Sequence, residues 1–133
     1  MSFVTLGEMS TKKIVRVLKN TDIFVTTYGV DSLFLVFMVP YSVIIEVQPD
    51  YFHDSTTSVL AFASDIYPII LSDVNRPIPR ECPVVNELVK SETGECRAIL
   101  KNREIEFDIK SMTQAIYQAR YYLVNNKMKV VKF

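Results

Sequence analysis

The sequence lacks the features that mark nucleic-acid binding, metal binding and secretion. Fifteen basic side chains balance fifteen acidic ones in a chain of 133 residues, so neither a nucleic-acid partner nor an anionic-membrane surface is indicated. One histidine and two cysteines are too few for an ordinary zinc site, and we expect no metal and no cofactor. The first residues lack a basic region and an apolar core, so no signal peptide is expected there. The cellular compartment therefore stays open.

A run of apolar residues long enough for a transmembrane helix is also missing. The most apolar segment, Val30 to Met38, has about nine residues, whereas a helix that spans a bilayer needs roughly 20. We therefore expect no membrane span and interpret this segment as a buried helix between two parallel strands. A hydrophobic content of 49% excludes disorder as the general state, and a length of 133 residues predicts a single folded domain over residues 1–133.

The chain is organised around the segment from Asp22 to Pro49. Its two apolar runs, Ile23–Val25 and Val43–Val47, have the near-continuous hydrophobic character of strands that are covered on both faces. These runs predict a pair of parallel strands. The helix between them is expected to bury Leu33, Phe34 and Phe37.

The neighbouring segments add two helices and a third strand. Residues 10–20 and 55–63 predict helices, each opened by a serine or threonine that can cap the first turn. Ile66–Leu71 predicts a strand, of which Ile69–Leu71 joins the parallel sheet. Pro68 lies inside this strand and indicates a position at the edge of the sheet, because proline cannot donate to a ladder of hydrogen bonds.

The second half of the chain is less regular. Residues 72–95 are polar and rich in proline, which predicts a long excursion on the surface. Cys96–Leu100 and Glu104–Asp108 are interpreted as the two arms of a hairpin. A last helix is expected from Lys110 or Ser111 to about Asn125, and the basic tail from Met128 to Phe133 is a further strand candidate. The packing side of that helix would consist of Met112, Ile116, Ala119 and Leu123.

The two cysteines, Cys82 and Cys96, lie inside this excursion and just beyond it. In an oxidising lumen they would form a disulfide, which requires α-carbons within roughly 7 Å of each other. In the cytosol they would be free thiols. The sequence leaves both states open.

The order of the expected helices and strands predicts an α/β fold, a Rossmann-like layered domain with a mainly parallel sheet. In such sheets, ligands bind outside the carboxyl ends of the strands, where a turn leads into the start of a helix. The corresponding turn in this chain is Thr26–Ser32.

The same part of the chain carries an extended motif without a gap. It consists of Asp22, Ile23–Val25, Thr26-Thr27, Tyr28-Gly29-Val30, Phe37-Met38-Val39-Pro40, Val43–Ile45, Glu46 and Pro49. This motif resembles the core of glycosyltransferase family 61 and its relatives, the protein O-mannose and EGF-domain O-linked N-acetylglucosaminyltransferases. The family pattern has an acidic residue, three apolar and two small residues, a His-Gly-Ala turn, a helix ending in Phe-Leu-Pro-Pro, and an apolar strand followed by Glu and Pro.

The resemblance implies the nucleotide-sugar-binding C-terminal half of a GT-B glycosyltransferase in the ER or Golgi lumen, completed by a second domain or chain. In the family, the His-Gly-Ala turn approaches the diphosphate of the donor. A glycine that allows close backbone approach, followed by a helix N-terminus, suits an anion. The sequence identifies no catalytic residue. The implied donor-binding residues are Thr27, Tyr28, Gly29, Val30, Asp31, Ser32 and Glu46.

The turn departs from the family pattern at Tyr28 and at Val30-Asp31, which stands in place of a small Ala-Gly pair, and a glycine expected near Tyr41 is also missing. Tyr28 replaces the histidine, which keeps a hydrogen-bond donor but no cation near neutral pH. Asp31 puts a carboxylate where a diphosphate would lie, and like charges repel. The alternative function is a non-catalytic binding or scaffolding module that retains the fold.

Each candidate site residue also has a purely structural interpretation. Tyr28 can be a packed aromatic residue, Asp31 a helix cap, and Glu46 a cap of the turn that follows its strand. His53, the single histidine, is interpreted as a surface loop residue rather than as a base or a metal ligand.

Overall fold

The core of the fold is a three-stranded parallel sheet. A computed structural model of the chain describes residues 4–73, 77–85, 88–89 and 94–130. The sheet consists of β1 (Ile23–Thr27), β2 (Val43–Gln48) and β3 (Tyr67–Ser72), in the order β1-β2-β3. Ile23 pairs with Val43, and Val43 pairs with Tyr67, both in parallel register. The α/β fold and the parallel pairing expected from the sequence are confirmed.

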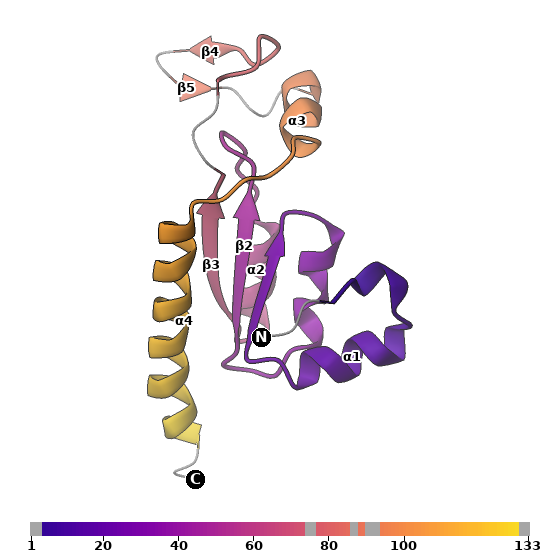
Figure 1. Ribbon diagram of the computed structural model, residues 1–133, viewed down its shortest axis with the longest axis vertical. Coiled ribbons are helices and arrows are strands. Elements are labelled where there is room, and N and C mark those ends of the chain that lie inside the picture. The colour runs from indigo at the N-terminus through magenta and orange to yellow at the C-terminus, as the bar shows by residue number, and fades with distance from the viewer. Residues whose placement is uncertain (1–3, 74–76, 86–87, 90–93, 131–133) are drawn as a thin grey trace.

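The two faces of the sheet are covered by different helices (Figure 1). Side chains of neighbouring strand residues point to opposite faces. Ile44 accordingly lies in a cluster with residues of α1 (Thr11–Lys19), the 3₁₀ helix η2 (Val30–Phe37) and α2 (Thr56–Ala63). Val43 and Ile45 instead pack against Ala115 and Ala119 of α4 (Ile109–Val130). Because helices cover both faces, all six residues of β2 are buried.

Several local expectations are confirmed by these elements. The Ser10 hydroxyl caps α1 by accepting a hydrogen bond from the Lys13 amide, and Ile14 and Leu18 bury one face of this helix. The helix over residues 56–63 is present as α2. Strand β3 lies at the edge of the sheet, as Pro68 indicated.

The segment between β1 and β2 buries different residues from those expected. It forms a 3₁₀ helix, whose three residues per turn bring positions i, i+3 and i+6 to the same side. Ser32, Leu35 and Met38 therefore face the core, with exposed fractions of 2%, 0% and 6%. Leu33 is 43% exposed, and Phe34 and Phe37 are only partly buried, so the expectation of a buried Leu33 was wrong.

The hairpin expected after the excursion was also wrong. Cys96–Leu100 lies in α3 (Gly94–Lys101), and no regular element covers Glu104–Asp108. Cys96 and Leu100 are four residues apart, so the α-helical period puts both on one buried face, where they contact Phe52.

The last helix is longer than expected. The amide side chains of Asn125 and Asn126 donate to the carbonyl groups of Tyr121 and Tyr122, one turn earlier, and the helix continues through them. Residues 128–130 are therefore helical rather than a strand, and residues 131–133 lie outside the described part of the chain. Among the described residues, no helix is long and apolar enough to cross a membrane.

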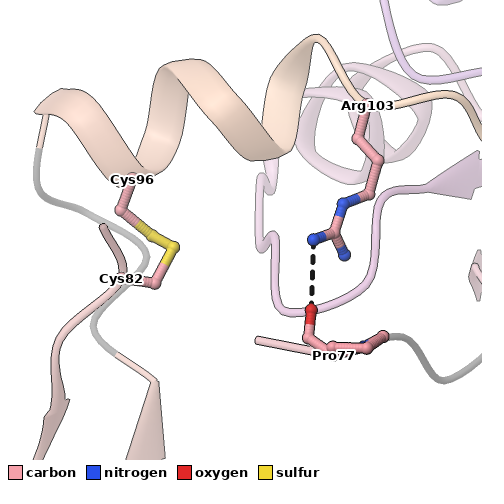
Figure 2. The surroundings of a disulfide bond; sticks show 4 residues. All are labelled: Pro77, Cys82, Cys96 and Arg103. Atoms are coloured by element: carbon pink, nitrogen blue, oxygen red, sulfur yellow. Dashed lines mark hydrogen bonds between the residues drawn. A yellow bond between two sulfur atoms is a disulfide. The ribbon is translucent and has the colours of Figure 1, made fainter. Parts of the chain in front are cut away.

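A small lobe lies beyond the carboxyl ends of the three strands (Figure 1). It contains α3 and two short antiparallel strands, β4 (Val84–Val85) and β5 (Leu88–Val89). Cys82 and Cys96 are joined by a disulfide, with α-carbons 4.7 Å apart, within the distance expected for a bridge (Figure 2). After α3, Arg103 donates a hydrogen bond of 3.2 Å to the Pro77 carbonyl group. We refer to β4, β5, α3 and their disulfide as the disulfide lobe.

Candidate functional site

The turn that follows β1 is shaped by Gly29. Its φ angle of 153° lies in a region that residues with a side chain rarely adopt. The preceding Tyr28 amide still donates to the Val47 carbonyl group at 2.8 Å, which extends the sheet by one residue. The Ser32 hydroxyl and amide both donate to the Gly29 carbonyl group, at 2.6 and 3.2 Å, and close the turn. Val30 and Asp31 remain exposed on its outer side.

Tyr28 turns its side chain toward the loop that follows β2. Its ring packs edge-on against Phe52, with ring centroids 4.6 Å apart. Its hydroxyl group donates a hydrogen bond of 3.0 Å to Asp54 Oδ2. Tyr28 is thus a packed aromatic residue whose polar end has a specific carboxylate partner.

Asp54 connects three separate parts of the chain. Its Oδ2 atom accepts both the Tyr28 hydroxyl and Nη2 of Arg97, which comes from α3, each at 3.0 Å. Its Oδ1 atom accepts the Thr56 amide at 2.8 Å, at the start of α2. The Arg97 guanidinium carbon lies 4.6 Å from the centre of the Phe52 ring, a cation–π contact. We call Tyr28, Phe52, Asp54 and Arg97 the Asp54 cluster.

The cluster favours an ionised Asp54 beside a protonated Tyr28. Hydrogen bonding from Thr56 is the largest cause of the lowered pKa of Asp54. Burial is the next largest and opposes it, and Tyr28 and Arg97 each add a smaller lowering effect. Burial is the largest cause that raises the pKa of Tyr28, followed by its hydrogen bond to Asp54. The Tyr28 hydroxyl is therefore a hydrogen-bond donor at neutral pH.

Glu46 supports the same region from inside the fold. Its side chain has an exposed fraction of 0%. Oε2 accepts the Thr57 hydroxyl at 2.7 Å, and Oε1 accepts Nε2 of Gln48 at 2.9 Å. The Gln48 side chain also donates to the Asp54 carbonyl group at 2.8 Å and accepts the Asp54 amide at 3.3 Å. This network fixes the backbone of Asp54.

A shallow hollow beside the cluster is lined mainly by polar residues. His53 lies on its rim and is exposed, in agreement with a surface loop position. The described part of the chain contains no group of three His, Cys, Asp or Glu side chains that could hold a metal ion. The lining residues are Gln48, His53, Asp54, Ser55, Ser58 and Ile70.

The candidate residues therefore lie near the carboxyl ends of the strands but have different roles. Thr27 to Ser32 form the turn, whereas the buried carboxylate of Glu46 reaches the turn only through Gln48, Asp54 and Tyr28. The sequence interpretation missed Asp54 and Arg97, which are 43 residues apart and share no local pattern. The only signal in the sequence was that Arg97 directly follows Cys96, a residue that can close the excursion.

Comparison with known proteins adds no family assignment. No protein-family model matches the chain, and no curated protein matches it.

Proposed function

We propose that this chain is the nucleotide-sugar-binding half of a glycosyltransferase of the family 61 type, with a changed diphosphate turn. The observation that carries the proposal is the Gly29 turn, which leaves the carboxyl end of a parallel strand and enters a helix. This is the position at which α/β sheets bind ligands. The motif from Asp22 to Pro49 supplies the link to the family.

The turn has the physical properties that a diphosphate requires from a backbone. Gly29 has no side chain to obstruct close approach, and the space where a Cβ atom would lie is open. The amide groups at the start of η2 carry a partial positive charge. Thr27, Tyr28, Val30 and Ser32 flank this glycine, and Glu46 stabilises the neighbouring loop. The acceptor and the catalytic base would come from a second domain or chain.

Asp31 opposes the ligand in this proposal. Its carboxylate is exposed in the first turn of η2. There it stabilises the N-terminus of the helix when no ligand is bound, and it repels a phosphate. Binding of a nucleoside diphosphate by this chain alone should therefore be weak. Replacing Asp31 by glycine should strengthen it by up to about fivefold, the effect of removing one exposed like charge worth about 1 kcal/mol or less.

A titration with uridine and guanosine diphosphate, followed by amide NMR shifts, tests the proposal. The expected shifts centre on residues 27–32. In Asp31→Gly they should saturate at a lower ligand concentration than in the wild type. Asp65→Gly is the matched control, because Asp65 is exposed, has a positive φ of 56°, and lies at the opposite end of the sheet. An equal response of both variants, or shifts that map elsewhere, would argue against a diphosphate turn.

The second candidate function is a non-catalytic binding or scaffolding module. It is favoured by the Asp54 cluster, in which a carboxylate of the chain itself already occupies Tyr28 and Arg97. If neither diphosphate shifts the amides of the turn in the wild-type chain or in Asp31→Gly, this function is preferred.

A further inference from the structure

We propose that the Asp54 carboxylate is an internal occupant of an anion site made by Tyr28 and Arg97, and that a diphosphate binds there by displacing it. This inference rests on the proposed function and names the side chains that would recognise the charged part of the ligand. It assigns Arg97, which the sequence interpretation did not include, to ligand binding.

Two donors from distant parts of the chain converge on one oxygen atom. The Tyr28 hydroxyl comes from the end of β1 and the Arg97 guanidinium from α3, yet both donate to Asp54 Oδ2 at 3.0 Å. Arginine makes the same charge-assisted hydrogen bonds to a phosphate oxygen as to a carboxylate oxygen. The two donors therefore form a site that suits either anion.

Arg97 is both oriented and accessible. The Phe52 ring holds the guanidinium group from one side at 4.6 Å. The Arg97 side chain is 38% exposed, whereas that of Asp54 is 13% exposed. A guanidinium group has five N–H donors in a flat fork, so an incoming phosphate can approach it from solvent while the ring keeps its orientation.

Asp54 can release the partners of Oδ2 while its other contacts stay in place. Its Oδ1 atom still caps α2 through the Thr56 amide, and its backbone is held by both ends of the Gln48 side chain. A change of partner at Oδ2 therefore requires a side-chain movement and no unfolding of the loop.

The proposed anion site adjoins the Gly29 turn through Tyr28. Tyr28 precedes Gly29, so it belongs both to the cluster and to the turn proposed to bind the diphosphate. In our proposal one phosphate group lies at the Gly29 turn and the other replaces the carboxylate on Arg97.

Titration of the whole chain with inorganic pyrophosphate, followed by amide NMR shifts, tests the inference. Asp54→Asn removes the charge but keeps the shape and an oxygen that can cap α2, so it should bind pyrophosphate about tenfold more tightly than the wild type. Adding Arg97→Gln to Asp54→Asn should abolish the gain. The shifts should include the amides of Tyr28, Phe52 and Arg97.

Two outcomes would overturn the inference: no gain in Asp54→Asn, or a gain that persists when Arg97 is replaced. If Asp54→Asn fails to fold, Arg97→Gln alone decides, because it should remove the residual pyrophosphate shift at Tyr28 and persistence of that shift would contradict us. Uridine diphosphate separates this inference from the proposed function. Wild-type binding at the turn without a gain in Asp54→Asn retains the function and rejects the displaced carboxylate.

Discussion

The parallel sheet and the disulfide lobe are stabilised in different ways. Every residue of β2 is buried, and a hydrophobic cluster covers each face of the sheet. The lobe contributes Cys82, Cys96 and Leu100 to a small cluster around Phe52, and it is further tied by the disulfide and by the ion pair of Arg97 with Asp54. Because the sheet depends on many buried side chains and the lobe on few contacts, we expect the lobe to open without the sheet.

The difference matters for the candidate site, because the site lies between the two parts. The Gly29 turn and Asp54 belong to the sheet and its loops, whereas Arg97 belongs to the lobe. A stable sheet keeps the turn in place, and a separable lobe allows the cationic side chain to adjust. Three changes test this comparison.

The largest effect is expected in the sheet. Ile44→Ala in β2 truncates a side chain with 0% exposure, and it should lower the free energy of unfolding by about 2–5 kcal/mol, as other large-to-small core substitutions do. Ile70→Ala in β3 is the matched control, since Ile70 is 38% exposed. Urea unfolding followed by circular dichroism measures both variants. Equal losses would contradict the distinction between a buried central strand and an exposed edge.

The next effect is expected in the lobe. Replacing Cys82 and Cys96 by serine removes a cross-link between residues 14 positions apart, and it should lower the opening free energy of α3 by about 3 kcal/mol. Amide hydrogen exchange should show lost protection in residues 94–101 and unchanged protection in β2. The same pair of positions changed to alanine should behave alike, because the cross-link is lost in both. A parallel loss in β2 would mean that the two parts open as one unit.

The smallest effect is expected at the contact between the two parts, as a dependence on pH. The folded state lowers the pKa of Asp54, so its stabilising contribution is present above about pH 4 and is lost as the pH falls through the lower, folded-state pKa. The stabilising contribution of the ionised Asp54 should be about 1 kcal/mol or less, as for other partly exposed ion pairs. Asp54→Asn should flatten the acid dependence of hydrogen exchange in α3.

The control for this prediction is Asp108→Asn. The pKa of Asp108 is also lowered, chiefly by the Ser111 amide at the start of α4, far along the chain from Asp54. This variant should alter the acid dependence of the first turn of α4 and leave that of α3 unchanged. If α3 responds to both variants alike, its acid dependence does not come from the Asp54 contact.

The sheet could be predicted from the sequence because its signals are local. Val43 to Val47 is β-branched and apolar except for Glu46, which favours a strand covered on both faces, and Pro68 favours an edge position for β3. The face of η2 could not be predicted in this way. A segment that is apolar on nearly every side fits an α-helix and a 3₁₀ helix equally. Only the packing in the folded protein decides that Leu35 is buried and Leu33 is exposed.

The site was predicted only in part for the same reason. The Gly29 turn is a local feature of a strand end, so the sequence could indicate it. The pairing of Asp54 with Arg97 depends on where the disulfide lobe packs, and the short run Cys96–Leu100 suits a strand or a helix by composition alone. The segment is helical in the folded protein because a helix buries Cys96 and Leu100 together against Phe52.

Pro68 also affects how this protein meets other molecules. The Tyr67 and Asp73 amides donate to Ser42 and Gln48, so the odd-numbered N–H groups of β3 point toward β2 and the even-numbered positions point outward. The missing N–H of Pro68 therefore lies on the outer edge. A foreign strand that paired there would leave a carbonyl group without a donor, which discourages aggregation through β3. The outer edge of β1 has no proline, so no missing N–H group opposes strand pairing there.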